Sequence, residues 1–300
     1  MLVSVIITTY SRPDYLVRAI ESVINQSYKS IEILVVDDNG KGKQQETTKE
    51  ILSNYKTVKL ITYSHNNGSC YARNIGVKNA SGDIVMFLDD DDYYLETKVE
   101  QQCENFINSD IDACICAMKR VDENNNEIIS DENFPRGRDL KSYILSGNCF
   151  TTMIAIKKNV FESLGGFSEI PRFQDKFFMY KFHKNSLKVK LINEKLFVMV
   201  EHNGQRISMG NIPKISSALN TLYQFEKENF LLLNSEEKEI IKNRFNKNMA
   251  EIRTNSTAKI RFNGILYLMK SNIFSIENNF SKQKIFMRLM LSDKIYNKLK

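Results

Sequence analysis

The sequence predicts an α/β protein in which a mostly parallel sheet is flanked by helices and followed by a helical C-terminal region. Three observations support this fold class. Short runs rich in Val and Ile alternate with helical spacing over the first hundred residues, several of these runs end in hydroxyl or acidic residues, and the spacing beyond Pro213 is helical throughout. Strands that alternate with helices indicate βαβ units, which build parallel sheets.

The first half opens with a strand and a helix. Residues 2–9 form a buried, β-branched run, and Ser11, Pro13 and Asp14 form a capping pattern at the start of a helix. The same periodicities predict further strands at 31–36, 58–63 and 84–88 and further helices at 46–55 and 69–79.

The remainder is less regular. Its pattern predicts helices at 94–108 and 174–183, strands at 113–121 and 150–156, and a short helix that ends at Leu164. We place a domain boundary near 211–213, which separates a domain at 1–211 from a basic helical region at 212–300.

Charge is unevenly distributed along the chain. The 300 residues include 42 Lys/Arg and 36 Asp/Glu, a net charge of +6. Residues 241–300 carry 13 basic and 3 acidic residues, so this part is +10 and the first 240 residues sum to −4. No run approaches the roughly 18 to 20 apolar residues that span a bilayer, and no signal peptide is recognised. We therefore expect five reduced cysteines and a cytoplasmic protein, either free or peripherally attached to the inner face of the cell membrane.

Polar side chains follow the predicted strands at the edge where open α/β sheets bind ligands. They comprise two hydroxyl residues, Arg12, Arg73 and six carboxylates, namely Asp37, Asp38, Asp89, Asp90, Asp91 and Asp92. Because six like charges on one edge repel one another, a divalent cation is the simplest partner. Mg²⁺ and Mn²⁺ are held by carboxylates together with substrate phosphates, which the arginines would face. This edge therefore predicts a site for a metal–diphosphate ligand.

Each acidic run also has a simpler interpretation. Four consecutive Asp residues can form a solvated loop, and Asp37-Asp38 can form a helix-capping turn. Their joint occurrence at the ends of two strands favours a binding site. No GxGxxG follows the first strand and no P-loop motif occurs, which argues against a dinucleotide enzyme or a P-loop NTPase.

The chain resembles a family 2 glycosyltransferase with the GT-A fold. The resemblance rests on VSVIITTYSRPDYL, IEILVVDD and NNGSCYARNIGVKNASGDIVMFLDDDDYY, which occur in the family's order. It is dense over 3–100, continues more weakly through Gly165-Gly166-Phe167 to Asp175, and leaves out the basic C-terminal region. It implies a catalytic domain at 1–211, with a nucleotide-binding half at 1–100 and an acceptor-binding half at 101–211.

The resemblance also implies roles for single residues. The base and ribose of the nucleotide would be held by Thr8, Thr9, Tyr10 and Asp38, the second residue of its pair, with Asp37 beside them. Arg73 would contact the base or the phosphates, and Arg12 lies near them. Leu88–Asp92 corresponds to the family's metal motif, which implies Asp89 and Asp90 near the ribose and Asp91 and Asp92 on Mn²⁺ or Mg²⁺. Asp175 would be the catalytic base, with Gln174 standing where the family has Glu.

Those residue types suit glycosyl transfer. A carboxylate can accept the proton of an acceptor hydroxyl as the new bond forms. A cation and arginines offset the charge of the leaving diphosphate. A single base without a second nucleophile implies inversion at the anomeric carbon, as the resemblance does.

Two further segments are candidates. After an apolar run at 196–200, His202 would reach the metal, and Arg206 and Ser208 would hold phosphate when this loop closes; a solvated turn is the alternative. His65 and His183 are expected at the surface. Residues 280–300 have a basic amphipathic pattern that fits an anionic membrane surface, packing on the protein or self-association. Nucleic acid is disfavoured because aromatic residues are not interleaved with the charges.

The sequence thus predicts a metal-dependent inverting glycosyltransferase. It would move a sugar from a nucleoside diphosphate, UDP above all, to a hydroxyl of a glycan or lipid-linked acceptor, and family analogy suggests bacterial cell-surface polysaccharide synthesis. Two alternatives stay open. A nucleotidylyltransferase would need a basic loop after the first strand, where only Arg12 is found, and a non-catalytic sugar-nucleotide-binding protein would not need Asp89, Asp91 and Asp175 intact.

Overall fold

The computed structural model describes residues 1–107, 109–201, 212–254, 258–270 and 279–290. They belong to two compact units. The first comprises Met1–Ile170 and Gln174–Gly204, and the second comprises Pro171–Phe173 and Gln205–Lys300.

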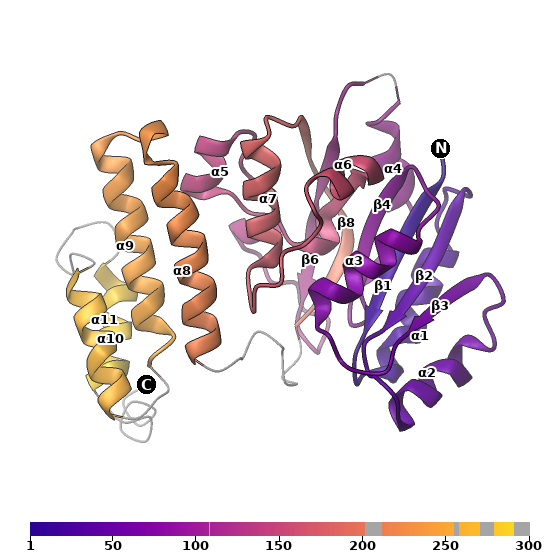
Figure 1. The fold of residues 1–300 in the computed structure, drawn as a ribbon, viewed down its shortest axis with the longest axis horizontal. Coiled ribbons are helices and arrows are strands. Elements are labelled where there is room, and N and C mark those ends of the chain that lie inside the picture. The colour runs from indigo at the N-terminus through magenta and orange to yellow at the C-terminus, as the bar shows by residue number, and fades with distance from the viewer. Residues whose placement is uncertain (108, 202–211, 255–257, 271–278, 291–300) are drawn as a thin grey trace. The chain divides into compact units, whose positions relative to one another are not determined.

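Within the described residues, the first unit contains an eight-stranded sheet in the order β3-β2-β1-β4-β7-β6-β8-β5 (Figure 1). The strands are β1 (Val3–Thr9), β2 (Ile31–Asp37), β3 (Val58–Thr62), β4 (Ile84–Asp89), β5 (Tyr93–Tyr94), β6 (Ala113–Val121), β7 (Ile154–Lys157) and β8 (Val189–Val200). The first four pair in parallel, as does β6 with β8, whereas β7 runs antiparallel to β4 and β6. The predicted fold class is confirmed.

Helices cover this sheet. They are α1 (Pro13–Ile24), α2 (Lys43–Leu52), α3 (Ser69–Asn79), α4 (Lys98–Glu104), α5 (Leu140–Ser146), α6 (Lys158–Ser163) and α7 (Gln174–Lys184), with 3₁₀ turns at Asp131–Asn133 and Thr151–Met153. All seven residues of β1 are buried, because this strand pairs on both sides and is covered by helices. In Figure 1, α3 crosses the sheet near β1. A Cβ on Gly76 of α3 would come within 2.5 Å of the Ile6 side chain, so glycine permits this close approach.

Several predicted element boundaries were wrong. Helix α1 begins at Pro13 with Arg12 as its N-cap, while Ser11 has a φ of 58° and donates its backbone N–H to Asn39 Oδ1 at 2.6 Å. Within the described part of the helix predicted at 94–108, the structure has α4, and the predicted start is wrong because Tyr93 and Tyr94 pair with β8. The strand predicted at 150–156 is a 3₁₀ turn followed by β7.

His183 is buried, which corrects the expectation of a surface histidine. It is 5% exposed and lies on α7, and its ring centroid is 5.0 Å from that of Tyr143 on α5. Burial lowers the pKa of His183 from 6.5 to about 4, although Asp139 opposes this. The unfolded chain therefore binds a proton that the folded chain does not.

We expect this buried histidine to make the protein less stable in acid. The free energy of unfolding is unaffected by His183 above pH 6.5. It falls as the pH decreases toward 4, by about 3 kcal/mol in total for this shift. Chemical unfolding of wild type and His183→Phe at pH 7 and pH 4.5 measures it, with the exposed His65→Gln as control. An equal loss of stability in wild type and His183→Phe would assign the acid sensitivity to other groups.

The second unit is helical. It contains α8 (Ile212–Glu228), a 3₁₀ turn at Phe230–Leu232, α9 (Ser235–Glu251), α10 (Ala258–Lys270) and α11 (Asn279–Met290). Its core has two clusters, one around Ile215, Leu219 and Met249, the other around Leu268, Ile285 and Leu289. Across both units, none of the described helices has the length and apolar character needed to cross a membrane.

Candidate active site

The parallel strands bring the predicted polar residues to one edge of the sheet. In the β1–β2 pairing Thr9 lies opposite Asp37, and in the β1–β4 pairing Thr8 lies opposite Asp89. Three segments that are far apart in the sequence therefore end side by side. At this edge β1 supplies hydroxyl groups, and β2 and β4 supply carboxylates.

The two aspartates after β2 have different surroundings. The Asp38 carboxylate accepts hydrogen bonds from Tyr63 Oη (2.7 Å), Asn66 Nδ2 (2.8 Å) and the backbone N–H groups of Asn67 (2.8 Å) and Gly68 (2.9 Å). Four donors fill the acceptor capacity of a carboxylate, so Asp38 holds the turn that leads into α3. Asp37 is fully buried, and its Oδ2 has no hydrogen-bond partner among the described residues.

Asp90 points into the protein. It is fully buried, accepts a 2.8 Å hydrogen bond from Thr9 Oγ1, and forms an ion pair with Arg12 at 2.9 Å. Burial raises the pKa of Asp90 to about 7, which Arg12 counteracts in part. Asp90 therefore joins the end of β1 to the acidic segment, and the structure gives it an internal role beside the predicted nucleotide site.

The other three aspartates of this segment form a cluster. Asp89, Asp91 and Asp92 each offer a carboxylate oxygen, and these atoms lie within 4.8 Å of one another. Asp92 is 4% exposed and accepts a 3.2 Å hydrogen bond from the backbone N–H of Val200. Burial, together with Asp91 and Asp89, raises the pKa of Asp92 well above its ordinary value. The sequence placed Asp89 at the ribose, whereas the structure groups it with the two predicted metal ligands.

Two arginines of the α1 region hold Asp91. Arg12 pairs with the carboxylate of Asp91 as well as with Asp90. Arg18 donates to the backbone carbonyl of Asp91 at 2.6 Å, and its guanidinium lies 4.8 Å from the centre of the Tyr93 ring. Arg18 belongs to no recognisable motif, so its contact with Asp91 was not predicted from the sequence.

Arg73 is a buried cation at this edge. It is 4% exposed, and its Nη2 donates to Asp89 Oδ1 at 2.5 Å, as Thr8 Oγ1 does at 3.4 Å. Its Nε and Nη1 have no hydrogen-bond partner among the described residues. A buried guanidinium with unsatisfied donors is costly unless a ligand accepts from them.

Asp175, the second residue of α7, lies within electrostatic reach of the same edge. Its Oδ1 accepts a 2.7 Å hydrogen bond from the backbone N–H of Lys176. Burial raises the pKa of Asp175, while the charge of Arg73 lowers it and that of Asp89 raises it. The fold thus brings the predicted base, the buried arginine and the acidic cluster together.

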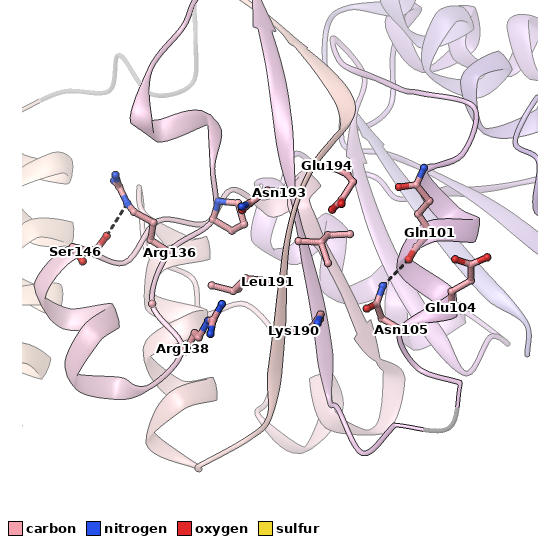
Figure 2. Close-up of a pocket in the computed structure, with 13 residues that line it drawn as sticks. Gln101, Glu104, Asn105, Arg136, Arg138, Ser146, Lys190, Leu191, Asn193 and Glu194 are labelled. Carbon is pink, nitrogen blue, oxygen red and sulfur yellow. Dashed lines mark hydrogen bonds between the residues drawn. The ribbon is translucent and has the colours of Figure 1, made fainter.

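Of the remaining candidates, Tyr10 is among the described residues. His202, Arg206 and Ser208 fall outside the described residues. Tyr10 is 42% exposed at the end of β1, and its backbone N–H donates to Asp90 at 3.3 Å. A polar cavity of about 840 Å³ opens beside β8 and α4, lined by residues such as Arg138, Lys190 and Glu194 (Figure 2). Its lining includes none of the predicted site residues.

Three curated relatives resemble this chain. An uncharacterized glycosyltransferase of Haemophilus influenzae is 41% identical over 101 residues, which is 34% of this chain and 40% of the relative. Glycosyltransferase GlyG of Streptococcus pneumoniae is 25% identical over 217 residues, 68% of this chain and 72% of the relative. The Escherichia coli UDP-Glc:alpha-D-GlcNAc-diphosphoundecaprenol beta-1,3-glucosyltransferase WfaP is 37% identical over 103 residues, 34% of this chain and 39% of the relative.

Solved structures share the fold. TarS 1–349 of S. aureus, in complex with UDP-GlcNAc, superposes with a TM-score of 0.59 at 18% identity, covering 100% of this chain and 93% of that one. Mannosyltransferase PcManGT of Pyrobaculum calidifontis, in complex with GDP-Man and Mn²⁺, gives a TM-score of 0.58 at 15% identity, covering 99% and 82%. Both likenesses show the GT-A fold.

A family model decides the classification. The model for glycosyl transferase family 2 matches residues 4–172, which include β1 to β4, Arg73 and the Asp89–Asp92 segment. This match covers more than half of the chain and contains the whole acidic edge. The chain is a family 2 glycosyltransferase.

Proposed function

We propose that this protein transfers a sugar from a UDP-sugar to a hydroxyl of a glycan or lipid-linked acceptor, with inversion at the anomeric carbon. One observation carries the proposal: the acidic cluster, the buried Arg73 and Asp175 are brought together at the edge of the sheet. In this proposal residues 1–211 form the catalytic domain, with the nucleotide bound by 1–100 and the acceptor by 101–211, and residues 212–300 form an attached helical region.

The acidic cluster fits a hard divalent cation. Three carboxylate oxygens within 4.8 Å of one another match the ligands that Mg²⁺ and Mn²⁺ prefer. Burial and then the charges of Asp91 and Asp89 raise the pKa of Asp92, and a cation would relieve this charge repulsion. A cation held by Asp89, Asp91 and Asp92 would supply positive charge for the leaving diphosphate. The complex of PcManGT with Mn²⁺ is consistent with this assignment.

Unsatisfied polar atoms mark where the nucleotide would bind. The free Nε and Nη1 of Arg73 suit an anionic or carbonyl oxygen of the donor. Asp37 Oδ2 is a buried acceptor that could receive a hydrogen bond from the nucleoside. Asp38 is less suited to this role, because its carboxylate already accepts four hydrogen bonds. We therefore propose Asp37 as the main acidic contact to the nucleoside, with Thr8, Thr9 and Tyr10 beside it. TarS, which was solved with UDP-GlcNAc, supports UDP as the nucleotide.

Asp175 would accept the proton of the acceptor hydroxyl. Its raised pKa makes it a stronger base than an ordinary aspartate, and ionised Asp175 is favoured by Arg73. The acceptor is proposed from WfaP, whose name describes a sugar linked to diphosphoundecaprenol. That lipid-linked acceptor suggests a role in bacterial cell-surface polysaccharide synthesis.

Donor binding tests the proposed function directly. We expect UDP to raise the melting temperature when Mn²⁺ or Mg²⁺ is present and to have little effect in EDTA, because the diphosphate would share the cation with the acidic cluster. UDP release from a panel of UDP-sugars then identifies the donor. The proposal would be refuted if the protein showed no cation-dependent UDP binding and no turnover of any nucleotide sugar.

Exposed apolar side chains and basic residues occur together on α10 and α11 of the second unit. Phe262 (61% exposed), Leu266 (45%) and Met269 (62%) are spaced along one face of α10. Helices α10 and α11 together contain six basic residues and no acidic residue. We propose that this basic, apolar face binds anionic lipid, where a lipid-linked acceptor would be found.

We expect the protein to bind vesicles of phosphatidylglycerol and phosphatidylcholine in sedimentation, and to bind pure phosphatidylcholine weakly. Phe262→Glu combined with Met269→Glu should abolish this binding, since it places charges on the apolar face. Leu231→Glu is the matched control, because Leu231 is 97% exposed in the same unit but lies outside α10 and α11. Unchanged vesicle binding by the double variant would contradict the assignment, and a change in its oligomeric state would point to self-association.

A further inference from the structure

Asn74 links the helix that carries Arg73 to the loop that precedes α7. Its side-chain Nδ2 donates to the backbone carbonyl of Phe167 at 2.8 Å, and its Oδ1 accepts from the backbone N–H of Phe167 at 2.9 Å. The two residues are 93 positions apart. A single side chain therefore satisfies both backbone groups of one distant residue, as a neighbouring strand would.

The loop from Leu164 to Phe167 is shaped for this contact. Gly166 has a φ of 65°, and a Cβ at this position would come within 2.5 Å of Asn74 Oδ1. From the opposite side, Lys181 of α7 donates to the backbone carbonyls of Leu164 at 2.9 Å and Gly166 at 2.6 Å. The loop is thus bound to α3 through Asn74 and to α7 through Lys181.

The Phe167 ring occupies the space between the elements of the site. It is 1% exposed, and its centroid lies 5.2 Å from that of Phe87 and 5.0 Å from that of Phe178. Phe87 precedes Asp89 by two residues on β4, and Phe178 lies one turn after Asp175 on α7. The guanidinium of Arg73 lies 5.8 Å from the centre of the same ring. Phe167 therefore packs against β4, α3 and α7, of which β4 is held in the sheet by pairing with β1 and β7.

We propose that Asn74 is a positioning residue for glycosyl transfer, which sets Asp175 at the correct distance from the Arg73–Asp89 pair. This inference rests on the proposed function, in which Asp175 is the base. Nucleotide binding depends on residues of β1, β2, β4 and α3, which stay in place without the contact between Asn74 and Phe167. Loss of that contact frees the loop and α7, and so it affects the chemical step more than it affects donor binding.

The test separates turnover from binding. A misplacement of about 1 Å costs roughly a hundredfold in rate, so Asn74→Ala should lower kcat for UDP-sugar turnover between about tenfold and a hundredfold. Its Kd for UDP with Mn²⁺ should stay within about twofold of wild type. Lys181→Met, which removes the contact on the other side of the loop, should show the same pattern. Asn79→Ala is the matched control, because the side chain of exposed Asn79 on the same helix donates to the backbone carbonyl of Ile75 in its own helix at 2.8 Å.

Each outcome bears on the inference. An active wild type with an equally active Asn74→Ala would overturn it and leave the proposed function intact. Parallel losses of kcat, UDP affinity and melting temperature in both variants would overturn it as well, because they indicate a general structural role. If Asn74→Ala does not fold, a wild-type kcat in Lys181→Met would overturn the inference. A wild type without any nucleotide-sugar turnover would overturn the proposed function and this inference with it.

Discussion

Asp175→Asn is expected to lower kcat for transfer by about 10² to 10⁴-fold while UDP affinity changes by less than about threefold. Asn has nearly the same shape and keeps an oxygen that can accept the N–H of Lys176, so the start of α7 stays intact. What disappears is the basic oxygen that would take the proton of the acceptor hydroxyl. Steady-state turnover of the identified UDP-sugar, together with calorimetric titration of UDP, measures both effects.

The pH dependence of wild-type turnover gives an independent check on this base. Burial raises the pKa of Asp175, so the carboxylate becomes protonated at a higher pH than an ordinary aspartate. Because the base acts only when ionised, kcat should fall as the pH decreases through this raised value. Asp110→Asn, at a carboxylate whose side chain is 82% exposed, serves as the control. Full turnover by Asp175→Asn would assign the base to another residue.

The acidic edge was accessible to sequence reasoning because parallel strands impose it. Buried β-branched runs identified β1, β2 and β4, and the pairing of Thr8 with Asp89 and of Thr9 with Asp37 follows from their parallel order. Arg73 was included because it follows the third predicted strand, and the family resemblance added Asp175, which lies on a helix and has no strand register to place it. That these residues bind nucleotide and cation stays a prediction.

The sequence could not distinguish the six carboxylates from one another. Their differences come from partners that are distant in the chain: Thr9 lies 81 residues from Asp90, and the donors to Asp38 begin 25 residues after it. The burial of His183 has the same origin, since Tyr143 of α5 packs against it. Only the end of β8, at 196–200, was recognised as an apolar run. Its earlier residues are partly or fully exposed in several places and lack the continuous apolar pattern of β1.

Asp92→Asn is expected to have opposite effects on stability and on ligand binding. Asp92 is 4% exposed, and its neighbours Asp91 and Asp89 disfavour its ionised form. Because its folded-state pKa lies above the ordinary value, ionisation costs stability as the pH rises through the raised pKa. The neutral amide removes this cost, so the cation-free variant should melt higher than wild type at pH 8, by about 2 to 4 °C for each kcal/mol recovered.

The same substitution should weaken cation-dependent UDP binding by roughly a hundredfold, because a charged contact of about 3 kcal/mol is lost. Thermal melts with and without Mn²⁺ and UDP measure both effects in one experiment. The amide can still accept the Val200 N–H, so a change in the local backbone would not explain the loss. Asp90→Asn separates charge from coordination: it too removes a buried carboxylate with a raised pKa, but one that pairs with Arg12 and lies outside the cluster, so it should leave the Mn²⁺ response in place. An Asp92→Asn protein that keeps a full Mn²⁺-dependent shift would show that the cation binds elsewhere.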